Sequence, residues 1–221
     1  VSLAPLQQLT SDFGTMSRHD GDPVPHEHQF YRATLKGLFS LDLANAGTFT
    51  YRGKTGFRNL DDLRRQEAAE LGLTHLGAQQ AYQLSVDQRA RRVSALMAGL
   101  ARLNGGAKQA IHYTDVNPSL ILLAVTRGGN HIFHHVVRAD GRGLPQVNVE
   151  ALEEMMQVFR DDLLSPIYIG WPKGYLSDEH RATVQEALVQ AGQQQPIMHP
   201  REAVGAFAAA LLDPANTAWL E

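Results

Sequence analysis

Apolar and polar residues alternate over residues 29–43 (QFYRATLKGLFSLDL). One set of alternate positions is mainly apolar and the other mainly polar, which is the period-two pattern of a strand with one buried face. The pattern spans roughly 14 residues, whereas ordinary strands have about 3–10. We therefore expect this strand to leave its sheet and continue into a hairpin arm. GTFTYRG (47–53) is a candidate neighbour, and we interpret 48–84 as a possible loop insertion.

A helical period appears at about 85–103 (SVDQRARRVSALMAGLARL). Ser85 and Gln88 have the spacing of a capping box at the start of this helix. A glycine pair at 105–106 is typical of its end. Further helices are expected at 148–162, entered through Asn148, at 178–192 and at 200–212.

Two short apolar runs, LILLAVT (120–126) and HIFHHVV (131–137), flank the turn sequence RGGN and predict a hairpin. PIYIGW (166–171) predicts a short buried strand. The order strand, helix, hairpin, helix, strand favours an α+β fold with helices on one face of the sheet. Ferredoxin-like and RRM-type folds have this arrangement, and we expect one such domain over 1–221.

Composition excludes several classes of protein. The 221 residues are 43% apolar and 19% charged, as in an ordinary soluble globular protein. The chain has no cysteine, which excludes disulfides, thiolate zinc sites and cysteine nucleophiles. The chain contains no run of about 18 apolar residues, the length that predicts a membrane span. The first residues, VSLAPLQQL, resemble a strand already under way, so we expect an N-terminal segment to precede them.

Charge is distributed unevenly along the chain. The net charge is −3, yet residues 1–127 carry 14 Lys/Arg against 11 Asp/Glu, while residues 128–221 carry 6 against 12. A basic half beside an acidic half is compatible with a groove for a polyanion. Chance unevenness is the alternative explanation.

Histidines and acids cluster in TSDFGTMSRHDGDPVPHEHQFYR (10–32). His26 and His28, with His19, Asp20 and Asp22, are residue types that bind first-row metals. HExxH is absent, and prolines make the segment extended, so we favour a projecting arm over a metal site. GxSxG, P-loop and GxGxxG motifs are also absent. We therefore expect no catalytic residue and no cofactor.

A third candidate site is LNGGAKQA (103–110). Glycines let backbone N–H groups approach an anion, Lys108 adds a positive charge, and Gln109 can bond a sugar or a base edge. A glycine helix cap followed by an ordinary loop has the same pattern.

Two long, separated stretches carry a family resemblance. TSDFGTMSRHDGDPVPHEHQFYRATLKGLFSLDL followed by GTF, and later LARLNGGAKQAIHYTDVNPSLILLA, resemble the DevR-type CRISPR autoregulator family. Members of this family are crRNA-binding backbone subunits of type I (I-B-like) Cascade complexes. The match covers most of residues 8–130, and the C-terminal third adds little to it.

The resemblance implies a non-catalytic, cytoplasmic prokaryotic protein that polymerises along a CRISPR RNA in antiviral defence or transposon targeting. Its partners are then the crRNA, target DNA paired with that guide, further copies of the chain and other Cascade subunits. Each copy has an RRM-like palm and a thumb hairpin, which falls on about residues 12–30. The thumb pushes one base aside at regular intervals, and the other bases remain free to pair.

Carried over to this sequence, the resemblance implies several RNA contacts. Met16 is the candidate wedge beside the displaced base, because an unbranched apolar stem suits that task. Arg18 and His26 are candidate phosphate or ribose contacts, and Arg32 and Lys36 share the polar strand face that lines a groove. The GGAKQ loop adds Gly106, Lys108 and Gln109. Ordinary packing of Met16 and a solvated strand face are the alternatives.

Two other functions are compatible with these residues. Related type III subunits cut target RNA with an aspartate near the thumb, and Asp12, Asp20 or Asp22 are candidates for that role. A stand-alone single-strand RNA-binding regulator is the second alternative.

Overall fold

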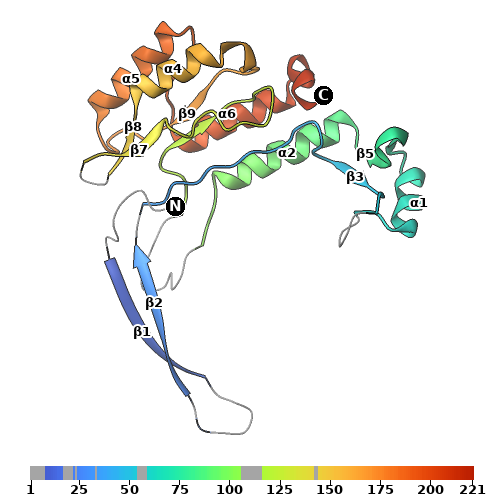
Figure 1. Cartoon of the computed structure of the whole chain (residues 1–221), viewed down its shortest axis with the longest axis horizontal. Coiled ribbons are helices and arrows are strands. Elements are labelled where there is room, and N and C mark those ends of the chain that lie inside the picture. Colours follow the sequence, from blue (N-terminus) through green and yellow to red (C-terminus); the bar gives the residue numbers. More distant parts are fainter. Residues whose placement is uncertain are drawn as a thin grey trace.

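The computed structural model of this chain describes residues 8–16, 22, 24–32, 34–53, 59–105, 116–141 and 144–221. It is an α+β protein with small antiparallel sheets and five described α-helices (Figure 1). The strands are β1 (Gln8–Met16), β2 (Val24–Arg32), β3 (Thr48–Thr50), β4 (Thr74–Leu76), β5 (Ala81–Gln83), β6 (Ile121–Leu123), β7 (Val137–Ala139), β8 (Pro145–Val147) and β9 (Tyr168–Gly170). The helices are α1 (Asp62–Glu70), α2 (Val86–Leu100), α4 (Val149–Val158), α5 (Asp178–Gln190) and α6 (Pro200–Leu212). Of the described helices, none has the length and apolar character that a membrane crossing requires.

The helices begin where their capping residues predicted. The Gln88 backbone N–H donates to Ser85 Oγ, and the Ser85 backbone N–H donates to Gln88 Oε1, so the expected capping box is confirmed. Asn148 caps α4 through its side-chain oxygen. Pro200 is the first residue of α6, where its missing N–H costs nothing.

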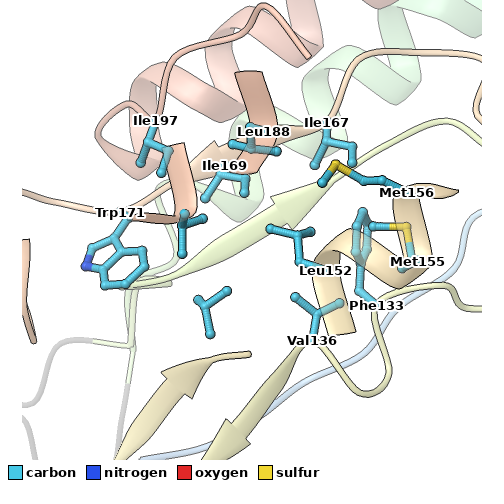
Figure 2. Close-up of a cluster of buried hydrophobic side chains, with 12 residues drawn as sticks. Phe133, Val136, Leu152, Met155, Met156, Ile167, Ile169, Trp171, Leu188 and Ile197 are labelled. Carbon is cyan, nitrogen blue, oxygen red and sulfur yellow. The ribbon is translucent and has the colours of Figure 1, made fainter. Parts of the chain in front are cut away.

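The body of the molecule is built around the antiparallel pair β6–β9. Ile167, Ile169 and Trp171 alternate along β9 and its flanks and lie in one buried cluster with residues of α4 and α5 (Figure 2). Tyr168 and Ile121 belong to a second cluster, formed with α2 and α6. Helices therefore cover both faces of this sheet, whereas the sequence predicted helices on one face.

Gly170 allows α6 to approach the sheet. A Cβ atom at Gly170 would lie 2.5 Å from Pro200 Cα and 2.7 Å from Ile121 Cγ2. Met198, just before α6, pairs with Gly170 in a parallel bridge and extends the sheet by one short segment. A side chain at position 170 is incompatible with this packing.

The predicted hairpin over 120–137 is wrong. β6 pairs with β9, which is distant in sequence, and residues 132–136 form turns. Phe133 and Val136 are both buried, at a spacing that suits a turn and not a strand. The hairpin that does form joins β7 to β8.

The predicted long strand at 29–43 is also wrong. β2 ends at Arg32, and residues 34–42 form no further strand. Leu35 and Phe39, expected on a buried face, are 61% and 46% exposed. β3 pairs with β5, so it is no neighbour of that segment. Residues 48–84, interpreted as a possible loop insertion, contain the three-stranded sheet β3-β5-β4 and α1.

Candidate nucleic-acid interface

The β1–β2 hairpin extends away from the body, with the Met16–Val24 end farthest from it (Figure 1). Each strand has nine residues, which gives the arm a length of about 30 Å. In the described part of the chain the two strands pair with each other and with no third strand. A two-stranded ribbon is only marginally stable in water by itself. A hairpin therefore lies in the region where the sequence predicted one, and among the described strands it belongs to no larger sheet.

The strand register brings three predicted contact residues to the same face of the hairpin. Gly14 pairs with His26, Met16 with Val24 and Gln8 with Arg32. Because directly paired residues and every second residue share a face, positions 16, 26 and 32 lie on one face. The side chains of Met16 and Arg32 lie outside the described part.

His26 lies over a glycine. A Cβ at Gly14 would be 3.0 Å from Cε1 and 3.1 Å from Nε2 of the His26 ring, so Gly14 provides the space for this imidazole. The His26 and His28 rings meet edge to face with 4.4 Å between centroids. His26 Nδ1 is buried and has no hydrogen-bond partner among the described residues. A ligand that supplied a partner would recover the cost of about 1–3 kcal/mol that an unsatisfied buried polar group carries.

Phe13 lies on the opposite face of the hairpin, paired with Glu27, and is 74% exposed. The sequence analysis did not single out this residue. Its signal was present, because Phe13 is the one aromatic residue inside the otherwise polar run TSDFGT. Phe13 therefore lies on the face away from His26, apart from the predicted contacts at positions 16, 26 and 32.

Lys36 fastens the segment after the hairpin to the body. Its Nζ donates to the backbone carbonyls of His134 at 2.5 Å and Val137 at 2.8 Å. The sequence placed Lys36 with Arg32 on one face of a long strand, but Lys36 lies beyond the end of β2. Its observed partners are carbonyl oxygens, and its role as an RNA contact stays a prediction.

His131 lies in the turn that Lys36 contacts. Its Nδ1 accepts from the Phe133 backbone N–H at 3.3 Å. Burial, and then the nearby charges of His134 and Lys36, lower the pKa of His131 below its ordinary value of 6.5, although a backbone hydrogen bond acts in the opposite direction. The neutral imidazole is therefore the form that suits this turn.

Four predicted contacts lie outside the described residues: Arg18, Gly106, Lys108 and Gln109. His19 and Asp20 of the possible metal cluster lie outside them too. Over the ranges that the structure describes, no three His, Asp or Glu side chains come close enough together to share a metal ion. The structure thus places positions 16, 26 and 32 on one face of the hairpin. Lys36 lies beyond the second strand, and Gly106, Lys108 and Gln109 of the GGAKQ loop lie outside the described residues.

Comparison with family models, with curated proteins and with solved structures gave no match.

Proposed function

We propose that this chain is a crRNA-binding backbone subunit of a type I Cascade complex. It polymerises along the guide, and the β1–β2 hairpin is the thumb that crosses the RNA. The proposal rests on the resemblance of residues 10–43 and 100–124 to the DevR-type family. No catalytic step is assigned to the chain, whose task in the complex is to hold the guide while base pairing reads the target.

The observation that carries the proposal is the projecting hairpin. An arm of about 30 Å reaches across several nucleotides of an extended strand. Positions 16, 26 and 32 share its face by register, so an apolar residue at the tip stands in line with a histidine and an arginine. That order suits a base wedge followed by contacts to the ribose-phosphate backbone.

In this proposal the body is the palm. Its RRM-like form stays a prediction, because the described central sheet consists of β6 and β9 with helices on both faces. Lys36 has a positional role in this proposal, since its bonds to the His134 and Val137 carbonyls hold the segment after the hairpin against the body.

The number of copies on one guide tests the proposal. The purified chain is mixed with a CRISPR RNA, and the mass of the complex is measured by light scattering. We expect several copies per guide, in a number that grows with guide length. The Met16→Asp variant should assemble less well, because a charge at the tip opposes insertion beside a base. Phe13→Ala, on the other face of the same arm, is the matched control and should assemble as the wild type does.

Two outcomes would replace the proposal. A one-to-one complex at every guide length indicates a stand-alone RNA-binding module. Cleavage of a labelled target RNA at regular intervals in the presence of Mg²⁺ indicates a type III-like subunit, and Asp12, Asp20 and Asp22 are then the residues to replace.

A further inference from the structure

The β3-β5-β4 sheet carries a cluster of rings that the sequence analysis did not identify. Phe49 pairs with Tyr82, and Tyr82 pairs with His75 on the other side of β5. Directly paired residues share a face, and so does Tyr51, two residues beyond Phe49. Ala81, the neighbour of Tyr82, belongs to the opposite face and is buried. All four rings therefore belong to the face opposite Ala81, where His75 is exposed and the other three residues are half-buried.

Three of these rings, those of Tyr51, His75 and Tyr82, form a compact cluster. The rings of Tyr51 and His75 are stacked with an interplanar angle of 20° and 6.0 Å between centroids. Tyr51 Oη and His75 Nε2 are 3.0 Å apart and share a hydrogen bond, which fixes the orientation of both rings. The ring centroids of Tyr82 and His75 are 4.9 Å apart, with an angle of 33° between the ring planes. His75 is exposed and Tyr82 half-buried, so solvent reaches this part of the ring cluster.

Arginines lie over the same rings. The Arg65 guanidinium is 4.9 Å from the centre of the Tyr51 ring, and the Arg92 guanidinium is 5.9 Å from the centre of the Phe49 ring. Both side chains are exposed. Stacking on an aromatic ring leaves the N–H groups at the guanidinium edge available to an acceptor. A phosphate beside the ring cluster would be such an acceptor.

A shallow groove of about 490 Å³ runs beside the ring cluster, between the sheet and α2. Phe49, Leu84, Arg91 and Arg92 are among the residues that line it. Its lining thus combines apolar side chains with two cationic ones. Its lining residues belong to β3, to the segments beside β4 and β5 and to the first half of α2, and these elements lie away from the β1–β2 hairpin (Figure 1).

The surrounding charge favours a polyanion. Residues 48–105 carry nine Lys/Arg and five Asp/Glu, whereas residues 144–221 carry four and eleven. Aromatic side chains on which bases stack, set in a positively charged groove, are the recurring features of surfaces that bind single strands. A duplex keeps its bases stacked inside and offers no free base face to such rings.

We propose that the ring face of the β3-β5-β4 sheet is a second nucleic-acid site, which binds unpaired bases of a single strand. A base stacks on His75 and Tyr82, and Arg65 and Arg92 contact the flanking phosphates. This site is separate from the hairpin and goes beyond the proposed function, because it requires neither a guide nor a filament.

Binding of a short oligonucleotide tests the site. Fluorescence anisotropy of a labelled oligothymidylate or oligouridylate of about ten nucleotides gives the affinity for the whole chain. We expect Tyr82→Leu to weaken binding by about tenfold, whereas Tyr82→Phe, which keeps the ring, retains wild-type affinity. Arg65→Gln should reduce the dependence of affinity on salt by about one phosphate contact.

Cross-linking separates this site from the hairpin. Ultraviolet irradiation of the complex, followed by mass spectrometry, should place the nucleotide on a peptide that contains His75 and Tyr82. His75→Ala, an exposed substitution that leaves the sheet pairing in place, should abolish that cross-link and weaken binding even if Tyr82→Leu fails to fold. Thermal unfolding of each variant reports on folding.

Three results would overturn the proposal. The first is wild-type affinity and salt dependence in His75→Ala, Tyr82→Leu and Arg65→Gln. The second is cross-linking confined to residues 8–32, which would leave the hairpin proposal standing alone. The third is binding of a proline-rich peptide to the ring face while the oligonucleotide does not bind at all, which would make the face a protein-docking surface. Conversely, if the cross-link at His75 persists while no filament forms on a guide, the proposed function fails and this site stands.

Discussion

The body and the β1–β2 hairpin are stabilised in different ways. In the body, two buried clusters on either side of β6–β9 hold the helices, and Trp171 in one of them is 0% exposed (Figure 2). In the hairpin, the strands pair with each other, and the aromatic Phe13 remains largely exposed. Burial of apolar surface drives the folding of the body, while the described side chains of the hairpin contribute little burial. Folding therefore constrains the residues of the hairpin less than those of the body, which leaves them open to selection for binding a ligand.

The largest effect we predict contrasts one aromatic residue from each region. Trp171→Ala should lower the free energy of unfolding by about 3–5 kcal/mol, because it leaves a cavity in the body and removes the hydrogen bond from Trp171 Nε1 to the Tyr175 carbonyl. Phe13→Ala should change it by no more than about 0.5 kcal/mol. Urea denaturation of both variants measures the two values. Equal losses would contradict the division between the two regions.

Arg89 gives the next largest effect. This buried guanidinium donates to the carbonyls of Leu43, Ala44, Ala46 and Leu220, and so joins α2 to the turn before β3 and to the C-terminal segment. Arg89→Met should cost about 2–4 kcal/mol, since these carbonyls would lose their partners. Arg91→Met, on an exposed part of the same helix, is the control and should stay near wild type. A fully stable Arg89→Met variant would show that water replaces the guanidinium.

Lys36 lies at the boundary between the two regions, and replacing it should lower the free energy of unfolding by less than replacing Arg89. Lys36→Met removes the bonds to the His134 and Val137 carbonyls and should cost about 1–2 kcal/mol. Hydrogen exchange should accelerate in residues 34–42 while the body cluster keeps its protection. Lys173→Met, an exposed lysine of the body, should leave both unchanged. If hydrogen exchange in residues 34–42 were unaltered, the two Lys36 hydrogen bonds would contribute nothing to the stability of that segment.

Acidification should have the smallest effect, through His131. The pKa of His131 is lower in the folded protein than its ordinary value of 6.5, so the unfolded chain takes up the proton first as the pH falls. Stability due to this residue is therefore fully present above about pH 6.5 and decreases as the pH falls through that value. Denaturation at about pH 7.5 and about pH 5.5 should show a smaller decrease for His131→Asn than for wild type. The same decrease in both proteins would assign the pH dependence to other groups.

The helices of the body were predictable because their signals are local. The Ser85–Gln88 capping box and Asn148 each mark a helix start within a few residues of chain, and the structure confirms both. The strand partners were not predictable in this way. β6 pairs with β9 across more than 40 intervening residues, and the short run 131–137 that seemed a better partner forms turns.

The two candidate sites, the hairpin and the ring face, also differ in whether local sequence signals predict them. The hairpin arm was found from its sequence, although its second strand ends at Arg32 and the alternating run beyond it is not a strand. Alternation predicts a strand only where another strand is present to pair with it. The ring face escaped notice because Phe49, His75 and Tyr82 come from three strands of three residues each, too short to show a period.

Displacement of a guide base by the hairpin can be detected with a fluorescent base. A series of CRISPR RNAs, each with 2-aminopurine at a different position, is bound by the purified chain. We predict increased fluorescence at regularly spaced positions, where a displaced base loses its stacking, and loss of that increase in Met16→Ala but not in Phe13→Ala. Fluorescence that is uniform along the guide, or a regular pattern that Met16→Ala leaves intact, would contradict the role of the hairpin.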